Sequence, residues 1–271
     1  MNRLWRGALR GACIAALTVL MAACAAPEST RPDPEGYRET MKTLNHQRAI
    51  QPLVLSRDLH VFKVGENLWV HRSYFDLGDQ RLHANGMIMA GPDRITIIDA
   101  PWTATAAYDL LDWLDANYPS QAKRLVVTHA HDDRMGSIDV FAERTIPVYS
   151  QRSTAEQARK LGWTAPNFVF DESLPLRSGE QAIELYFPGP AHTTDNIIAW
   201  FPDAKVLFGG CMVKSRHSGS LGFVGDANKP AWPRALQNAL ARYPEAEQVI
   251  PGHGLPGDTA LITHTLELLG H

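Results

Sequence analysis

Residues 128–134, with the sequence THAHDDR, place two histidines and two aspartates within five positions. His129 and His131 alternate along what the sequence predicts to be extended backbone, so both side chains can face the same way. Asp133 continues this spacing. Two imidazoles and a carboxylate suit zinc, a borderline-soft cation. The alternative, a solvated polar turn after a buried strand, stays open on this segment alone.

Three further candidate ligands stand apart in the sequence: His192 in GPAHTTDN, Cys211 after KVLFGG and His253 in PGHG. Each falls where a predicted strand opens into a loop, which is where binding sites are commonly built. A single histidine in a turn is usually a surface residue. Four histidines, an aspartate and a cysteine, all at strand ends, are better explained together as one metal site.

The elements that must position these residues are short strands that alternate with amphipathic helices. Strand patterns occupy residues 60–75, 86–100 (two strands joined at a turn), 124–133, 146–150, 182–192, 197–201, 205–210 and 248–254. Helical patterns occupy residues 104–119, 154–162, 231–244 and 258–270, with Thr103 as the cap of the first and Tyr108, Leu111 and Leu114 on its apolar face. The order predicts an α/β protein with sheets packed centrally and helices outside.

The motifs HAHDD, GPAHTTDN, GGCMVK and PGHG, in this order, closely resemble those of the class B metallo-β-lactamases of subclass 1. The phrases RYPEAEQVIPGHGLPG and SLGFVGDA are similar to theirs too. The resemblance covers about residues 60–265. It implies a single α/β domain with the four-layer αββα metallo-β-lactamase sandwich and a metal site at one edge of the two sheets.

The same resemblance implies two zinc ions and their ligands. One zinc would be held by His129, His131 and His192, and the other by Asp133, Cys211 and His253. Zinc-bound hydroxide would be the nucleophile, with Asp133 orienting it. The substrates would be penicillins, cephalosporins and carbapenems, whose β-lactam amide bond is hydrolysed, and the result would be antibiotic resistance.

Four more residues receive roles around this site. Lys214 stands three residues after Cys211, matching the C-x-x-K of the family, and would pair with the substrate carboxylate; the alternative is a solvated surface lysine. Arg134 is expected to balance charge beneath the second zinc, and Asp99 to organise the motif loop. Phe223 stands where relatives commonly have an asparagine, so it removes a hydrogen-bond donor near the substrate.

Other functions remain as alternatives. Glyoxalase-type hydrolases, many lactonases and the third β-lactamase subclass have a histidine where this chain has Arg134, and most of those hydrolases have an aspartate in place of Cys211. The second subclass lacks the first histidine, which is His129 here. One alternative function is a dizinc hydrolase of a lactone, thioester or phosphodiester. Another is a zinc-binding protein without activity.

The N-terminus predicts export. Residues 1–24 combine arginines, an apolar run and small residues, which is typical of a secretory signal peptide. The sequence MAAC ending at Cys24 resembles a bacterial lipobox, although ordinary cleavage is also compatible with it. Residues 25–47 are a polar tether and 48–271 the catalytic domain. These features place the protein in the periplasm of a Gram-negative bacterium, with a possible lipid anchor in the outer membrane.

Charge and composition limit the partners. The net charge of -3 and sequence pI of about 6.4 make a nucleic-acid partner improbable. A monomer is expected, since no heptad pattern or exposed apolar run indicates assembly. The hairpin FDLGDQRLH could close over substrate through Phe75 and Leu77, or pack them inward. His83 and His217 are expected at the surface rather than at the edge of the site.

Overall fold

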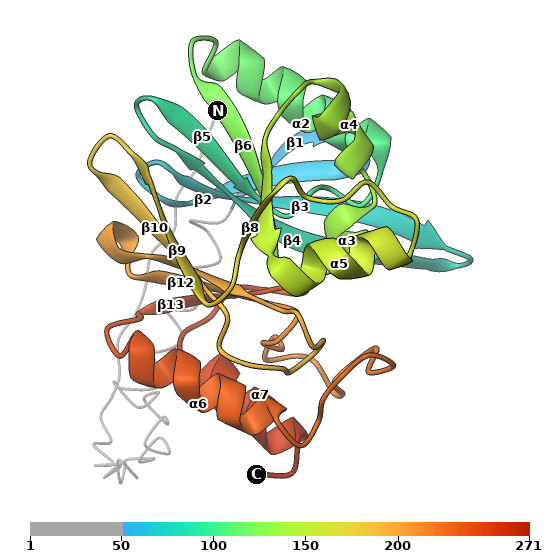
Figure 1. Ribbon diagram of the computed structural model, residues 1–271, viewed down its shortest axis with the longest axis vertical. Helices are drawn as coiled ribbons and strands as arrows, with labels where there is room; N and C mark the ends of the chain where they lie inside the picture. Colours follow the sequence, from blue (N-terminus) through green and yellow to red (C-terminus); the bar gives the residue numbers. More distant parts are fainter. Residues whose placement is uncertain (1–50) are drawn as a thin grey trace, which may run out of the picture. The chain divides into compact units, whose positions relative to one another are not determined.

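Alternating apolar residues build two β-sheets in the computed structural model, which describes residues 51–271 (Figure 1). The predicted signal peptide, the tether and Cys24 lie outside these residues. The first sheet has the strand order β1 (Leu53–Ser56), β2 (Leu59–Gly65), β3 (Leu68–Leu77), β4 (Gln80–Ala90), β5 (Arg94–Ile98), β6 (Ala122–Val127), β7 (Val148–Gln151) and β8 (Phe168–Phe170). Its first five strands are antiparallel, and β5 to β8 are parallel.

The second sheet has five strands. Their order is β13 (Gln248–Pro251), β12 (Val206–Gly210), β11 (Ile198–Phe201), β10 (Gln181–Tyr186) and β9 (Ser173–Ser178). Only β12 and β13 pair in parallel. A short 3₁₀ turn, η1 (Pro202–Ala204), joins β11 to β12.

Helices cover the outer face of each sheet, which gives the predicted four-layer αββα sandwich (Figure 1). The first sheet is covered by α2 (Ala104–Asn117), α3 (Asp132–Met135), α4 (Ile138–Glu143) and α5 (Arg152–Lys160). The second is covered by α6 (Trp232–Arg242) and α7 (Ala260–Leu268). None of the helices in residues 51–271 combines the length and the apolar character needed to cross a membrane.

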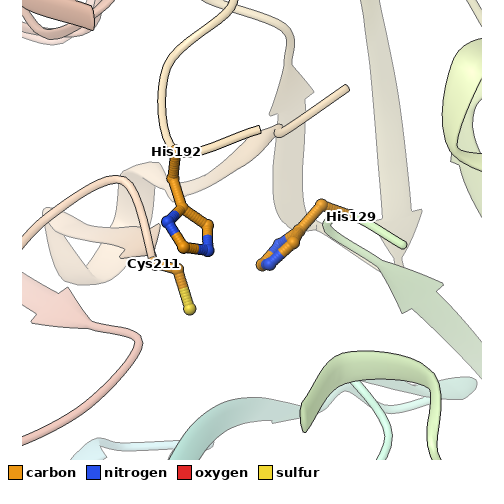
Figure 2. A group of neighbouring side chains, drawn as sticks. All are labelled: His129, His192 and Cys211. Carbon is orange, nitrogen blue, oxygen red and sulfur yellow. The ribbon is translucent and has the colours of Figure 1, made fainter. Parts of the chain in front are cut away.

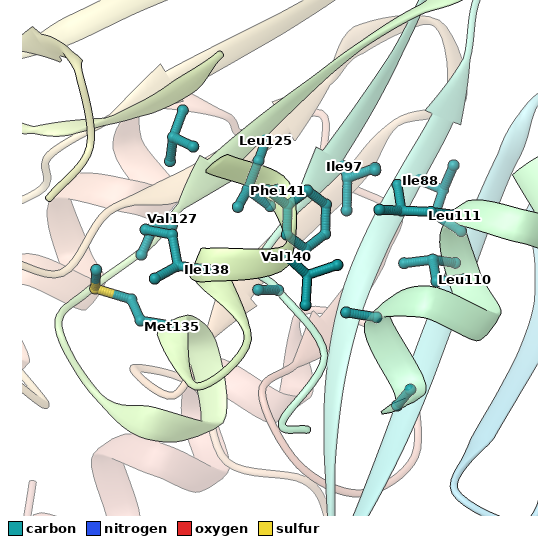
Figure 3. Packing of buried hydrophobic residues seen from close by; sticks show 14 of the residues in the cluster. Ile88, Ile97, Leu110, Leu111, Leu125, Val127, Met135, Ile138, Val140 and Phe141 are labelled. Atoms are coloured by element: carbon teal, nitrogen blue, oxygen red, sulfur yellow. The ribbon is translucent and has the colours of Figure 1, made fainter. Parts of the chain in front are cut away.

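Three buried apolar layers hold the sandwich together. Between the sheets, residues such as Phe62 and Met87 pack against Phe208. Beneath the first helical layer, Ile97 and Leu110 belong to a cluster with Phe141 (Figure 3). A third cluster, around the fully buried Trp232, joins α6 and α7 to the second sheet. Removing this much apolar surface from water is the main force that fixes the layers.

Helix α2 illustrates how far local sequence determines an element. Thr103 is its N-cap, as predicted, and the Thr103 hydroxyl accepts a hydrogen bond from the Ala106 amide at 3.2 Å. The predicted apolar face is partly wrong, because Tyr108 is exposed while Leu111 and Leu114 are buried. The buried stripe instead includes Ala107, one position earlier.

The sequence patterns missed several elements. Strands β8 and β9 were not predicted; β8 is three residues long and mostly exposed, and β9 alternates weakly. Helices α3 and α4 were also missed. The strand predicted through the HAHDD motif ends at Val127, because the chain bends at residues 128–131 and turns into α3 at Asp132.

Candidate metal centre

Strand ends from both sheets converge on the candidate site. Asp99 follows β5, His129 follows β6, Cys211 follows β12 and His253 comes two residues after β13. The β5–β6 and β12–β13 pairs are parallel, so the carboxyl ends of each pair meet at one edge of their sheet. The fifth segment, which carries His192, is the loop between β10 and β11.

The geometry within the HAHDD motif differs from the predicted strand. His129 lies in the bend after β6, and His131 has extended backbone as the N-cap of α3. Asp133 belongs to the first turn of α3 rather than to a strand. The helix therefore turns the carboxylate of Asp133 toward Cys211 and His253. In the predicted strand, it would instead have alternated with the two histidines on one face.

The structure brings the six predicted ligands together in three overlapping groups. In each group the possible ligand atoms lie within 4.8 Å of one another: His129, His192 and Cys211; His129, His131 and Asp133; and Asp133, Cys211 and His253. The last group is the predicted second ligand set. The predicted first set is divided between the other two groups. Figure 2 shows His129, His192 and Cys211 converging from three separate segments.

The rings of His129, His131 and His192, called the three-histidine cluster below, stand edge to face around one point. Their centroids are 4.7, 5.0 and 5.2 Å apart. His129 Nε2 and His192 Nδ1 are buried and have no hydrogen-bond partner. A buried polar atom is normally satisfied, so the unpaired Nε2 of His129 indicates a cation site within the cluster.

Neighbouring polar groups orient two of these rings. The Thr128 hydroxyl donates to Asp99 Oδ2 at 3.0 Å and lies 3.1 Å from His129 Nδ1. Because the Thr128 hydroxyl donates to Asp99, it can only accept from His129, so the proton of His129 lies on Nδ1 and the lone pair of Nε2 is left for the cluster. His131 Nε2 lies 3.0 Å from Asp226 Oδ2, which similarly leaves Nδ1 of His131 for a ligand.

Asp133, Cys211, His253 and Arg134, called the cysteine cluster below, contact one another directly. Cys211 Sγ lies 3.5 Å from Asp133 Oδ2 and 3.3 Å from His253 Nε2, and the latter two atoms are 3.1 Å apart. Ligands around a tetrahedral zinc with bonds of 2.0–2.3 Å are about 3.3–3.7 Å apart. The three donors therefore have nearly the spacing that zinc requires.

Arg134 supplies the positive charge of the cysteine cluster. It is fully buried, and its Nη2 lies 2.9 Å from both Cys211 Sγ and Asp133 Oδ2, while Nη1 lies 3.2 Å from Asp99 Oδ2. The close approach needs a glycine at position 252, since a Cβ there would lie 2.7 Å from Arg134 Nη2 and 2.8 Å from Cys211 Sγ.

The charges in the cysteine cluster shift the acid–base properties of its members. Burial raises the pKa of Asp133 and of the Cys211 thiol, but Arg134, His253 and His129 together outweigh burial and hold both pKa values well below their usual range. Burial lowers the pKa of His253, but Cys211 and Asp133 raise it overall. The cluster thus presents a thiolate and a carboxylate and favours a positive charge beside them.

The three-histidine cluster has the opposite character. Burial lowers the pKa of His129 to about 4. Burial, together with Lys214 and His131, lowers the pKa of His192 to about 2. Both imidazoles are therefore neutral at physiological pH, which is the form that binds a metal.

This donor set fits zinc. Neutral imidazoles, a thiolate and a carboxylate are the ligands that zinc takes in proteins, and two of the imidazole nitrogens have no other partner. The backbone carbonyl of His83 lies 2.6 Å from His253 Nδ1, which fixes Nε2 of His253 toward Cys211.

A cavity of about 800 Å³ opens over both clusters. This volume is typical of a small-molecule site. Lys214 and Phe223 both line it. Lys214 is buried, with its ammonium 5.5 Å from the centroid of Trp232, so it is not the solvated surface lysine of the alternative interpretation. Phe223 is 64% exposed, and its ring stands 5.5 Å from that of His131.

Two expectations around the cavity were wrong or incomplete. His83 is not a surface residue: it lines the cavity, and its Nε2 accepts a hydrogen bond from the Gly254 amide at 2.8 Å. His217 is exposed and does not line the cavity. In the β3–β4 hairpin, Phe75 is half-buried and its ring stacks on that of Trp102, with centroids 5.2 Å apart, but Phe75 does not line the cavity. Leu77 is exposed and does not line the cavity either.

Sequence reasoning missed several residues that line this cavity. They are Trp102, Leu161, Trp163 and Asp226. None belongs to a metal-ligand pattern, and Leu161 and Trp163 come from the end of α5, far from every motif. Only SLGFVGDA, which contains Asp226, carried a signal that could have identified it.

Comparisons with known proteins agree with this site. The family model described as the metallo-β-lactamase superfamily matches residues 80–253. The metallo-β-lactamase type 2 of Bacillus cereus is 31% identical over 236 residues, covering 86% of this chain and 92% of that relative.

Solved structures are similar as well. A metallo-β-lactamase from Pontibacter korlensis superposes with a TM-score of 0.76 and 35% identity, covering 79% of this chain and 99% of that one. The DIM-1 metallo-β-lactamase, exposed to ceftazidime, gives a TM-score of 0.74 and 36% identity, covering 79% and 97%.

Proposed function

The chain belongs to the metallo-β-lactamase superfamily, and from this premise we propose that it is a zinc-dependent hydrolase of the β-lactam amide bond. The proposal rests on one observation: six side chains that can bind metal lie together beneath one cavity, and a buried lysine lines the same cavity. The named relatives favour β-lactams over a lactone, thioester or phosphodiester. Such hydrolysis inactivates the antibiotics and would give resistance.

Two zinc ions are the proposed cofactors. His129, His131 and His192 would hold one, and Asp133, Cys211 and His253 the other. Zinc bound there would polarise the lactam carbonyl and lower the pKa of water, so that a nucleophile is available at neutral pH. The Asp133 carboxylate would accept a hydrogen bond from the attacking water and orient it.

Lys214 is the proposed partner of the substrate carboxylate. Lys214 lines the cavity and makes no salt bridge within residues 51–271. Burial lowers the pKa of Lys214, yet Cys211 and Asp133 oppose that shift. A buried cation without a carboxylate partner favours an anionic ligand, because an unpaired charge is costly away from water.

Asp99 and Arg134 act as support rather than as reacting groups. Asp99 accepts from the Thr128 amide at 2.7 Å, and so ties the start of the HAHDD motif to the end of β5. Arg134 neutralises the carboxylate and thiolate of the cysteine cluster. Losing either residue would misplace ligands without removing one.

Finer features of the function are part of the same proposal. The substrates include penicillins, cephalosporins and carbapenems. The protein acts in the periplasm of a Gram-negative bacterium as a monomer, after removal of residues 1–24 or lipidation at Cys24. The basic and apolar character of residues 1–24 supports export.

The test is hydrolysis of a penicillin, a cephalosporin and a carbapenem by residues 26–271, followed by absorbance. We expect turnover that EDTA abolishes and added zinc restores, with two zinc ions per chain by elemental analysis. If no β-lactam is turned over while two zinc ions are bound, the proposal is wrong, and lactones and phosphodiesters would be examined instead.

A further inference from the structure

Three exposed apolar side chains border the same cavity. Leu161 is 54% exposed, Trp163 36% and Phe223 64%, although the described part of the protein buries most of its large apolar residues. Leu161 and Trp163 come from the end of α5, while Phe223 comes from the loop between β12 and α6. Apolar side chains that gather at a concave site usually contact a ligand.

The end of α5 holds Leu161 and Trp163 in a fixed backbone conformation. The Trp163 amide donates to the Ala158 carbonyl at 2.9 Å and the Gly162 amide to Arg159 at 3.1 Å. Gly162 has φ +74°. This is the Schellman pattern that ends helices at a left-handed glycine. The two apolar side chains are therefore presented by a closed turn rather than by a long loop.

Phe223 is fixed from two other directions. Its ring stands nearly perpendicular to that of His131, with an interplanar angle of 74°. Its other neighbour is the backbone of Gly225, where a Cβ would lie 2.5 Å from the Phe223 Cζ atom. Only a glycine leaves room for the ring in this position.

The hairpin side of the cavity has different chemistry. There β4 contributes Arg81 and His83 together with Leu82. The Arg81 guanidinium is already paired with Asp76 and Asp58, at 2.8 and 3.0 Å. The hairpin thus brings two basic side chains and Leu82 to the cavity, and Trp102, which stacks on Phe75 of the hairpin, lines it as well. The end of α5, in contrast, brings only Leu161 and Trp163, while Lys214 offers the positive charge that a carboxylate needs.

From this arrangement we infer that Leu161, Trp163 and Phe223 form an apolar shelf that binds the aromatic acylamino side chain of a β-lactam. The inference rests on the proposed function and adds a substrate preference to it. A penicillin carries its carboxylate on the fused ring and its acylamino group across the β-lactam. With the carboxylate at Lys214 and the amide bond at the metal ligands, the side chain extends to the shelf, where its aromatic ring leaves water.

Benzylpenicillin and 6-aminopenicillanic acid test this preference, because they share the fused rings and carboxylate and differ only by the phenylacetyl group. We expect a lower KM for benzylpenicillin in the wild-type enzyme. The double variant Leu161→Ala/Trp163→Ala should raise the KM for benzylpenicillin roughly tenfold, the lower end of what a hydrophobic pocket discriminates. Its KM and kcat for 6-aminopenicillanic acid should not change.

A matched control is Leu53→Ala/Phe168→Ala, which removes apolar side chains of similar exposure, 49% and 47%, that do not line the cavity. It should change neither substrate. Phe223 is left intact in both variants, because its ring contacts His131. A second route is Gly225→Ala, which displaces the Phe223 ring and should reduce the preference for benzylpenicillin in the same direction.

Equal rises in KM for both penicillins, or no change for benzylpenicillin, would overturn the shelf while leaving the proposed function intact. If the zinc-loaded wild-type protein hydrolyses neither penicillin and no other β-lactam, the proposed function fails instead. Calorimetric measurement of the affinity of that protein for the same two compounds then tests separately whether the shelf binds the side chain. Tighter binding of benzylpenicillin, lost in the double variant, supports it, and equal affinities overturn it.

Discussion

The cysteine cluster and the three-histidine cluster lie side by side but satisfy their polar groups in different ways. In the cysteine cluster, Arg134 contacts both the thiolate and the Asp133 carboxylate at 2.9 Å. In the three-histidine cluster, two buried ring nitrogens have no partner. The first is held by its own ion pairs, whereas the second consists of three neighbouring imidazole rings that no ion pair joins to one another.

This difference predicts which cluster depends more on metal. Paired charges keep their geometry through mutual attraction, so the cysteine cluster should stay assembled in the metal-free protein. Neutral imidazoles do not attract one another, and an unsatisfied buried polar atom costs about 1–3 kcal/mol. Zinc binding should therefore stabilise the three-histidine cluster more.

The variant His192→Ala should produce the largest effect on activity. Losing one neutral ligand opens the three-histidine cluster, and a Lewis acid contributes several kcal/mol to such reactions. We expect kcat/KM to fall at least about 10³-fold, since each 1.36 kcal/mol is a factor of ten. Elemental analysis should find one zinc per chain instead of two. The control His271→Ala should keep both zinc ions. Unchanged zinc content in His192→Ala would contradict the assignment of His192 as a ligand.

The variant Arg134→Met tests the other cluster by removing its cation. It leaves a buried carboxylate and thiolate without a counter-charge, and breaking a buried ion pair costs about 3–5 kcal/mol. We expect the free energy of unfolding of the metal-free protein to fall by about 3 kcal/mol, measured by denaturant titration.

Arg134→Lys is the matched variant. It keeps the charge, but a lysine cannot present the planar fork that reaches Asp99 and Cys211 together. Its stability should lie between those of wild type and Arg134→Met. Equal stability of all three proteins would mean that the ion pairs do not hold the cysteine cluster.

Lys214→Ala should act on substrate binding rather than on either cluster. A hydrogen bond to a charged group contributes about 1.5–3 kcal/mol, so the KM for penicillins should rise roughly ten- to a hundredfold. The value of kcat should change much less. Lys214→Arg should recover part of the affinity, and zinc content should stay at the wild-type level. An unchanged KM would refute the proposed role.

The sequence predicted the candidate ligands more readily than their surroundings. His129, Cys211 and His253 could be selected as candidates because their side chains can bind metals and each stands near the end of a strand. Local spacing could not reveal that Asp133 is turned by α3 toward Cys211, since this depends on where β6 ends.

The fold shows the same limit. Strong patterns such as the Thr103 cap of α2 predicted elements correctly, because their determinants lie within a few residues. Strand β8 was missed because three residues carry too little pattern, and pairing with β7 defines it. The place of His83 beside Gly254 depends on contacts across 171 positions, which no local signal encodes.

Asp226 offers a smaller test of the three-histidine cluster. Its carboxylate lies 3.0 Å from His131 Nε2 and orients that ring. Substituting residues that orient metal ligands typically changes metal affinity 10- to 100-fold, and the 65% exposure of the Asp226 side chain favours about tenfold for Asp226→Ala. Competition with a chromophoric chelator measures the zinc affinity and resolves the weaker-binding zinc from the stronger-binding one. Asp203→Ala, also an exposed acid, should have no effect, and the proposed orientation fails if both variants bind zinc alike.

Phe223→Asn should have the smallest net effect, because it changes two things in opposite directions. The amide adds a donor near the substrate carbonyl, whereas the apolar contact with the side chain is lost. A single oxyanion donor contributes about 10²–10³ in rate where it is the main one, and zinc already acts here, so a gain of a few-fold is expected.

The two penicillins separate these contributions because they share the carbonyl and differ in the side chain. For 6-aminopenicillanic acid only the added donor counts, so kcat/KM should rise. For benzylpenicillin the gain should be offset by the lost contact, and the ratio of the two kcat/KM values should fall. If neither substrate responds, Phe223 faces the cavity without influencing what binds there, and the preference would then reside in Leu161 and Trp163 alone.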